Sequence, residues 1–246
     1  MLISSSFSWS NPSRDVELRV GSPARSFFID KNALCKRSPF FEAALSKKWK
    51  EGHAKVIELP DDNADAVLLY CCWVSNYSPF VYGFSCKEKT SNGDNPKALV
   101  EHQRYVDAYM FGDKVLDHDF CDMILDHLLK HAETVKLWPI SQFMRIFEVS
   151  GAQDPPRKLI PDLYEYVGEA KWYEKPCKDV SAEAWHAIAS AVYKRWPQKD
   201  GRQIWYRPTA RPWHTFPCRY HWHTKFGGRC YREKDSWEEG LTWRTL

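Results

Sequence analysis

The chain has 246 residues, of which 43% are hydrophobic and 27% are charged, a composition typical of an ordinary globular protein. This length is enough for one large domain or two small ones, each able to bury its own core. No stretch approaches the roughly 18 consecutive apolar residues of a membrane span, which argues against a membrane segment. Residues 1–14 are rich in serine and lack the basic and apolar regions of a secretory signal. We therefore expect a flexible lead-in there, and a protein of the cytoplasm or nucleus.

The beginning of the chain predicts a β-hairpin. Apolar and polar residues alternate strictly over 15–20, which is the period of a half-buried strand. A turn at 21–23, which contains glycine and proline, leads to a second extended run over 26–29. A third strand is predicted over 55–59, where the alternation returns before Pro60 stops it.

Helices are predicted between and after these strands. Asp30 is placed to cap a helix over 31–36, and Ser38, followed by a proline, predicts the start of a second helix. A third helix should follow Asp61 and Asp62, because negative charges suit a helix N-terminus. The apolar stripe of that third helix is expected to contain Ala64, Val67, Leu68, Cys71 and Val74.

The rest of the chain is predicted to be helical, with one insertion. Residues 76–98 are polar and have no period, so we expect an insertion loop. Two long helices follow, marked by Leu99, Val106, Tyr109, Met110 and Val115 in the first and by Phe120, Ile124 and Leu128 in the second. A helical extension over 135–200 should contain helices at 140–149, 159–173 and 182–196. Residues 201–246 show no helical period and predict an irregular C-terminal segment.

Taken in order, the motifs of residues 15–131 resemble a BTB/POZ domain. The resemblance rests mainly on Asp-Val-Glu-Leu-Arg-Val-Gly at 15–21, Arg-Ser-Pro-Phe-Phe at 37–41, Ile-Glu-Leu-Pro-Asp-Asp at 57–62 and Tyr-Met-Phe-Gly-Asp-Lys-Val at 109–115. The whole arrangement is similar to that of fungal BTB proteins with a helical C-terminal extension. The resemblance implies an α+β fold in which a small sheet is capped by a cluster of helices.

For function, the resemblance implies a protein–protein interaction module without enzymatic activity. Such a module is often a homodimer, or an adaptor that delivers clients to a cullin-type ubiquitin ligase. The sequence carries no motif of a phosphate-binding loop, a dinucleotide site, a zinc protease or a serine hydrolase, which agrees with a protein that is not an enzyme.

Cys218, His221, His223 and Cys230 form a group with metal-ligand chemistry. Two thiolates and two imidazoles make a complete set of ligands for a tetrahedral zinc ion. The two histidines are two residues apart, so an extended backbone would place both on one face. The glycines at 227–228 would let the chain turn back and bring the last cysteine to the others.

We interpret this group as a structural zinc site, with His214 as a spare ligand. The run Cys-Arg-Tyr-His-Trp-His at 218–223 is also similar to a segment near the C-terminus of fungal BTB proteins. One alternative is a tail whose cysteines and histidines only pack or face solvent. Another is a zinc metalloenzyme, which would need an open coordination position. The other six cysteines are expected to be small packing residues: Cys35, Cys71, Cys72, Cys86, Cys121 and Cys177.

The net charge of +3 conceals a basic C-terminal segment. Between Arg195 and Arg232 the chain carries nine basic residues and one acidic residue, Asp200. Such an uneven distribution of charge indicates an acidic partner for this end of the chain, or a basic arm folded onto an acidic body. The interleaved tryptophans and tyrosines also suit stacking on nucleic acid, which we keep as an alternative to docking within the protein.

Overall fold

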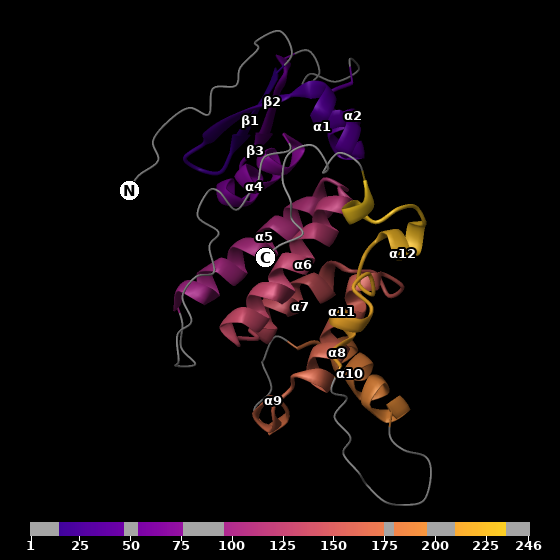
Figure 1. Cartoon of the computed structure of the whole chain (residues 1–246). Coiled ribbons are helices and arrows are strands. Elements are labelled where there is room, and N and C mark those ends of the chain that lie inside the picture. Colours follow the sequence, from indigo (N-terminus) through magenta and orange to yellow (C-terminus); the bar gives the residue numbers. More distant parts are fainter. Residues whose placement is uncertain (1–14, 47–53, 76–95, 175–179, 196–209, 235–246) are drawn as a thin grey trace, which may run out of the picture. The chain divides into compact units, whose positions relative to one another are not determined.

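The computed structural model describes residues 15–46, 54–75, 96–174, 180–195 and 210–234 (Figure 1). It is a mixed α+β protein, and its described part is mostly helical with a single three-stranded sheet. The chain divides into two compact units, the first formed by residues 1–136 with 231–246 and the second by 137–230. Among the described residues, no helix is long and apolar enough to cross a membrane. The expected lead-in at 1–14 lies outside the described residues.

The sheet of the first unit consists of β1 (Asp15–Val20), β2 (Arg25–Asp30) and β3 (Val56–Leu59), in the order β2-β1-β3. The predicted hairpin is confirmed, since β1 and β2 pair antiparallel. β1 also pairs with β3 in parallel, a relation that alternation alone does not predict. Because side chains alternate along a strand, Val16 and Leu18 both point to the buried face of the sheet.

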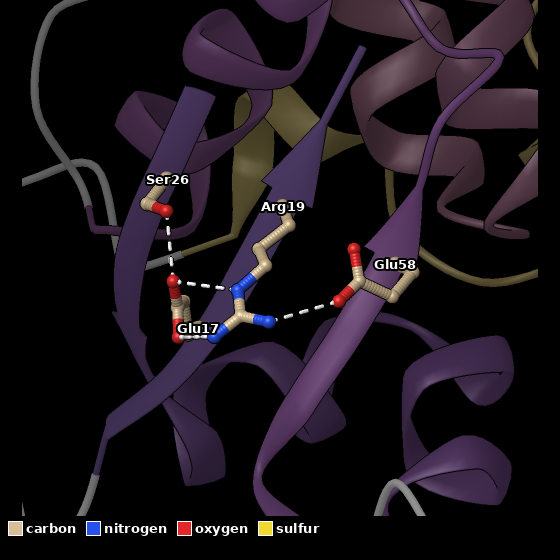
Figure 2. Close-up of polar contacts among 4 residues, drawn as sticks. All are labelled: Glu17, Arg19, Ser26 and Glu58. Atoms are coloured by element: carbon tan, nitrogen blue, oxygen red, sulfur yellow. Dashed lines mark hydrogen bonds and ion pairs between the residues drawn. The ribbon is translucent and has the colours of Figure 1, made fainter. Parts of the chain in front are cut away.

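The other face of the sheet is polar. Figure 2 shows Arg19 of β1 between Glu17 of the same strand and Glu58 of β3. The Nε atom of Arg19 donates to Glu17 over 2.9 Å, and its Nη1 atom donates to Glu58 over 3.1 Å. Ser26 of β2 donates to Glu17 over 2.7 Å. Hydrogen bonds from Arg19 and Ser26 lower the pKa of Glu17, and together these exposed contacts link all three strands.

The helices of the first unit are α1 (Lys31–Arg37), α2 (Pro39–Ala44), α4 (Ala64–Val74), α5 (Pro96–Lys114) and α6 (His118–Val135), with the 3-10 turn η3 (Tyr231–Glu233). Both predicted caps are confirmed. The Asp30 carboxylate accepts from the Ala33 amide over 2.8 Å, and Ser38 Oγ accepts from the Phe41 amide over 3.2 Å. Ser38 Oγ also donates to the carbonyl oxygen of Val115 over 2.5 Å, so the start of α2 is joined to the residue that follows α5.

Aromatic rings fill the core between the helices of this unit. The Tyr70 ring of α4 lies 5.3 Å from Phe111 of α5 and 5.0 Å from Phe120 of α6, both edge-to-face. Asp117 is buried beside them and caps α6 by accepting from the Phe120 amide over 3.0 Å. Its other carboxylate oxygen accepts from Trp73 Nε1 over 3.0 Å. The buried Asp117 carboxylate therefore fixes both the start of α6 and the position of the Trp73 ring.

Several expectations for α4 and α5 need correction. The helix expected after Asp61 and Asp62 is confirmed as α4, and Asn63 caps it by accepting from the amides of Asp65 and Ala66. The expected stripe is shifted: Ala64, Leu68 and Cys71 are only half-buried, whereas Ala66, Leu69, Tyr70 and Trp73 are buried together with Val67 and Val74. The expected loop at 76–98 ends earlier, since α5 begins at Pro96, and 76–95 lie outside the described residues. Leu99 is exposed rather than buried.

The second unit contains α7 (Ile140–Val149), η2 (Pro155–Lys158), α8 (Leu159–Tyr166), α9 (Ala170–Glu174), α10 (Ala182–Arg195), α11 (Pro212–Thr215) and α12 (His223–Phe226). The helix predicted at 140–149 is confirmed, and so is the one beginning at 182, where Ser181 Oγ accepts from the Ala184 amide over 3.2 Å.

The single helix expected over 159–173 is wrong, because the chain leaves the helical path between α8 and α9. The carbonyl oxygen of Tyr164 accepts from the Tyr173 hydroxyl over 3.1 Å. Gly168 lies so close to this carbonyl that a Cβ atom added to it would be 2.2 Å from the oxygen. The break folds α9 back, and the Tyr164 ring then lies 5.4 Å from Trp172 of α9 and from Trp185 of α10.

Candidate metal centre

The segment that carries the predicted ligands is built from short turns rather than from long helices. α11 and α12 have four residues each, and the residues between them form successive turns. In these turns the amide of Arg219 donates to the carbonyl of Phe216 over 2.9 Å, and the amide of His221 donates to that of Cys218 over 3.1 Å. Local hydrogen bonds of this kind satisfy the backbone where no apolar period could form a long helix.

Buried aromatic residues hold this segment in the second unit. Trp213 of α11 is buried, and its ring lies 5.6 Å from Trp138 and 6.4 Å from Tyr166 of α8. Trp222 is also buried, and its ring stacks on Phe226 with the planes 6° apart. The two described tryptophans of this segment thus supply its packing.

A buried carboxylate provides a polar anchor for the same segment. Asp162 of α8 is 3% exposed and accepts from Nε of Arg219 over 2.5 Å and from the Tyr220 hydroxyl over 2.8 Å. A further guanidinium nitrogen of Arg219 donates to its second oxygen over 3.2 Å. Burial and the neighbouring charge of Asp162 raise the pKa of Tyr220, which keeps the hydroxyl protonated as a donor. Arg219 and Tyr220, which this anchor binds, immediately precede His221 in the chain.

The four predicted ligands come together in the structure. One ligand atom each from Cys218, His221, His223 and Cys230 lies within 4.8 Å of all the others. The two sulfur atoms are 3.9 Å apart, and Cys230 Sγ is 3.7 Å from Nδ1 of His221. His221 and Cys230 are buried, whereas Cys218 and His223 are half-buried. This group can hold a metal ion.

The backbone reaches this arrangement differently from the expected extended strand. Trp222, between the two histidines, has φ −61° and ψ −33°, which is helical, and α12 begins at His223. The two imidazole rings still approach, with their centroids 5.6 Å apart, because histidine side chains are long enough to converge from a turn. The expected glycine turn is confirmed: Gly227 and Gly228 have φ +78° and +96°, values that a residue with a side chain rarely adopts.

The spare ligand proposed from the sequence is not part of the group. Among the described residues, the metal-ligand cluster contains the four residues above and leaves out His214. That residue is exposed on α11, and its ring contacts Trp213 edge-on at 6.2 Å. The remaining cysteines are elsewhere: Cys72 and Cys121 are buried, Cys35 and Cys71 are half-buried, and Cys86 and Cys177 lie outside the described residues.

Basic residues of the C-terminal segment pair with carboxylates of their own unit. In the second unit, Arg219 pairs with Asp162 and Lys225 pairs with Asp154 over 2.6 Å. In the first unit, Arg232 of η3 pairs with Asp126 of α6, and Lys234 pairs with Asp119 of α6 over 2.5 Å. The Tyr231 hydroxyl also donates to Asp126 over 2.5 Å. These four basic side chains are therefore neutralised within the protein.

Sequence reasoning did not identify Asp162 as part of this site. The only signal was an acidic residue at the centre of an apolar helical run, Leu-Ile-Pro-Asp-Leu-Tyr at 159–164. A carboxylate in such a place must be paired or hydrogen-bonded when the helix is buried. Its partners, however, lie 57 and 58 residues further along the chain, so no local pattern could name them.

The donor set favours a closed structural site over an open catalytic one. Two thiolates and two imidazoles occupy all four positions of a tetrahedral ion and leave none for water or substrate. Such a site would add cross-links to a segment that has no long helix of its own among the described residues. In comparisons with known proteins, no family model, no curated protein and no solved structure matches the chain.

Proposed function

We propose that this chain is a protein–protein interaction module of the BTB/POZ type, and that one structural zinc ion fixes its C-terminal segment. The observation that carries the proposal is the order of elements over residues 15–135. A hairpin, two capped short helices, a third strand and three longer helices follow one another as the resemblance implies. The proposed role is that of a non-enzymatic adaptor, either for a cullin-type ubiquitin ligase or as a homodimeric scaffold.

The use of buried polar groups supports a role in binding rather than in catalysis. Ser38 and Asp117 each satisfy a backbone amide at a helix start, and each makes a second bond to a group in another part of the fold. Catalytic side chains are instead expected in a cleft, within reach of a substrate. In this core the polar groups serve packing, which leaves the outer surfaces of the unit for recognition.

The spacing of the ligand atoms supports zinc. Two sulfurs bound to one tetrahedral zinc at about 2.3 Å lie about 3.8 Å apart, and a bound sulfur and nitrogen lie about 3.6 Å apart. The corresponding distances here are 3.9 Å between Cys218 and Cys230 and 3.7 Å between Cys230 and His221. Binding would therefore need little rearrangement of these three side chains. When bound, the ion would supply cross-links, not chemistry.

The alternatives receive less support. A zinc metalloenzyme would need one of the four ligand positions to be open. Nucleic-acid binding by the basic segment would require its cations to face phosphate, yet Arg219, Lys225 and Arg232 each pair with a carboxylate. If nucleic acid were nevertheless a partner, its affinity would fall steeply with added salt.

Native mass spectrometry of the full chain, with and without EDTA, tests both parts of the proposal. We expect one zinc ion per chain, lost in EDTA and in His221→Ala but kept in the matched variant His214→Ala. Equal loss in both histidine variants, or a wild-type chain that takes up no zinc, would refute the metal site. The same spectra report whether the chain is a dimer or binds a purified cullin. A monomer that binds no cullin would contradict the proposed assembly role without affecting the metal result.

A further inference from the structure

The two cysteines of the candidate metal centre are also placed to react with each other. Their sulfur atoms are 3.9 Å apart, close to van der Waals contact. Cys218 is half-buried, and Cys230 is 4% exposed. We propose that Cys218 and Cys230 form a reversible disulfide when the chain meets a peroxide without metal, so that the same residues serve either as zinc ligands or as a redox cross-link.

The chain around Cys230 has room for the movement that the bond requires. A disulfide has an S–S distance of about 2.05 Å, so the sulfurs must approach by about 2 Å. Residues 227–229, just before Cys230, are all exposed. A Cβ atom added to Gly227 or Gly228 would meet no atom within 4 Å, which leaves open space around this turn. Rotation within it can carry the second sulfur to the first without disturbing Tyr220 and its anchor.

The reaction balances with one peroxide for each disulfide. The more accessible thiolate, from Cys218, attacks the peroxide and becomes a sulfenic acid, while the other peroxide oxygen leaves as water. The Cys230 thiolate then attacks the sulfenic sulfur, the S–O bond breaks, and a second water leaves. In sum, the two thiols lose two electrons and two protons, and the peroxide takes up these electrons and protons to become two molecules of water. A thiol of the glutathione type reverses the step by exchange.

The other described cysteines are poorer targets. Burial raises the pKa of Cys35 and Cys71, raises that of Cys72 to about 11, and raises that of Cys121. Because the thiolate is the nucleophile, each of these groups reacts slowly at neutral pH. The short distance between the sulfur atoms of Cys218 and Cys230 therefore directs the reaction to this pair.

Metal and oxidation would compete for the same sulfurs. A zinc ion shares the thiolate lone pairs that would otherwise attack peroxide, and a disulfide removes two of the four ligands that hold the ion. This competition rests on the proposed zinc site, whereas the disulfide itself rests only on the position of the two sulfurs. In either state the residues between Cys218 and Cys230 remain closed into a loop.

The test uses the full chain, either zinc-loaded or stripped with EDTA, treated with hydrogen peroxide and then alkylated with N-ethylmaleimide. We expect the stripped chain to lose two hydrogen atoms in mass and to yield one disulfide-linked peptide pair containing Cys218 and Cys230. Reduction should restore both thiols. The zinc-loaded chain should react about tenfold more slowly, because metal bonding lowers thiolate nucleophilicity and access.

Two variants keep the outcome decisive. Cys218→Ser should abolish the linked peptides, whereas the matched variant Cys35→Ser, also at a half-buried cysteine, should leave them unchanged. Free thiols at both positions of the oxidised wild-type chain, or pairing of either with another cysteine, would overturn the inference. A chain that binds zinc but forms no disulfide would refute the inference and leave the metal site standing. A chain that forms the disulfide without binding zinc would support the inference and refute the metal site.

Discussion

Replacing Asp162 with asparagine is the sharpest test of how the C-terminal segment is held. The carboxylate is buried and accepts three hydrogen bonds, two from Arg219 and one from the Tyr220 hydroxyl. Asparagine keeps one accepting oxygen, loses the negative charge and turns a donor toward groups that are themselves donors. The substitution therefore leaves at least one buried donor without an acceptor and the guanidinium without its counterion.

The expected loss in free energy of unfolding follows from the burial of Asp162 and of its partner Arg219. Removing one member of a fully buried ion pair costs about 3–5 kcal/mol. The Arg219 side chain is 33% exposed, so water recovers part of its solvation and we expect about 2–3 kcal/mol. The matched variant is Asp154→Asn. Asp154 is also buried, but it has one charged partner, Lys225, whose side chain is 39% exposed and can turn to water. Its other oxygen accepts from the Gly151 amide over 2.6 Å, a bond that the oxygen of asparagine can keep, so this substitution should cost about 0.5–1 kcal/mol.

Hydrogen exchange of the full chain measures this effect where it arises. The amides of Arg219 and His221 are hydrogen-bonded within the turns beside the anchor, and they should exchange only when those turns open. A cost of about 2–3 kcal/mol corresponds to about 30- to 150-fold faster exchange in Asp162→Asn, against less than about tenfold in Asp154→Asn. Equal acceleration in the two variants would refute the argument that the buried carboxylate is the anchor.

Two further predictions concern single residues in the two units. At Asp117, burial raises the pKa to about 6, so the folded chain binds this proton more tightly than the unfolded chain does. The stability that this proton contributes is thus full below about pH 4 and is lost as the pH rises through about 6. In denaturation experiments from pH 4 to 8, the free energy of unfolding of the wild type should fall by about 1–3 kcal/mol relative to that of Asp117→Asn. A difference between the two chains that does not change with pH would contradict this. In Gly168→Ala, the new Cβ would lie 2.2 Å from the Tyr164 carbonyl oxygen. We expect the free energy of unfolding of the second unit to fall by more than about 2 kcal/mol, seen as a lower denaturation midpoint. An unchanged midpoint would disprove that the close approach of Gly168 to this carbonyl is a reason for the helix break.

The elements that could be predicted are those specified by neighbours in the sequence. Asp30 and Ser38 cap helices because a short side chain with an acceptor oxygen reaches an amide three residues later, whatever the rest of the fold does. The alternation over 15–20 specifies a strand with one buried face for the same local reason. Gly227 and Gly228 supply a turn because glycine tolerates the positive φ angles that this turn requires and other residues rarely adopt them.

The features that could not be predicted depend on partners far away in the chain. That β3 runs parallel to β1 is decided by packing and not by the composition of either strand. The Tyr164 carbonyl, near the end of α8, accepts from the Tyr173 hydroxyl of α9, a partner that the local sequence pattern does not indicate. In each case a tertiary contact outweighs a local preference.

The candidate site shows both kinds of information at once. Its four ligands were identified from residue type and spacing, because few combinations of cysteine and histidine can complete a tetrahedron. The backbone between them was not, since helical dihedrals at Trp222 replace the expected extended conformation. The residue types that can bind a metal are read directly from the sequence. The path of the backbone between them depends instead on tertiary packing, such as the burial of Trp213 and Tyr220.

The C-terminal segment lacks apolar periodicity because it is held at separate points rather than along a continuous face. Asp162 fixes Arg219 and Tyr220, the cysteine–histidine group joins Cys218 to Cys230, and Asp126 of the first unit receives Tyr231. Each restraint uses different side chains and a different kind of interaction, so the loss of one leaves the others in place. With zinc bound as proposed, removing the metal should therefore loosen 218–230 while the turn at Tyr231 stays on α6. Removing the Asp162 carboxylate should loosen 219–221 and leave the proposed metal binding in place. Such graded loosening is expected where stability is divided among separate local contacts.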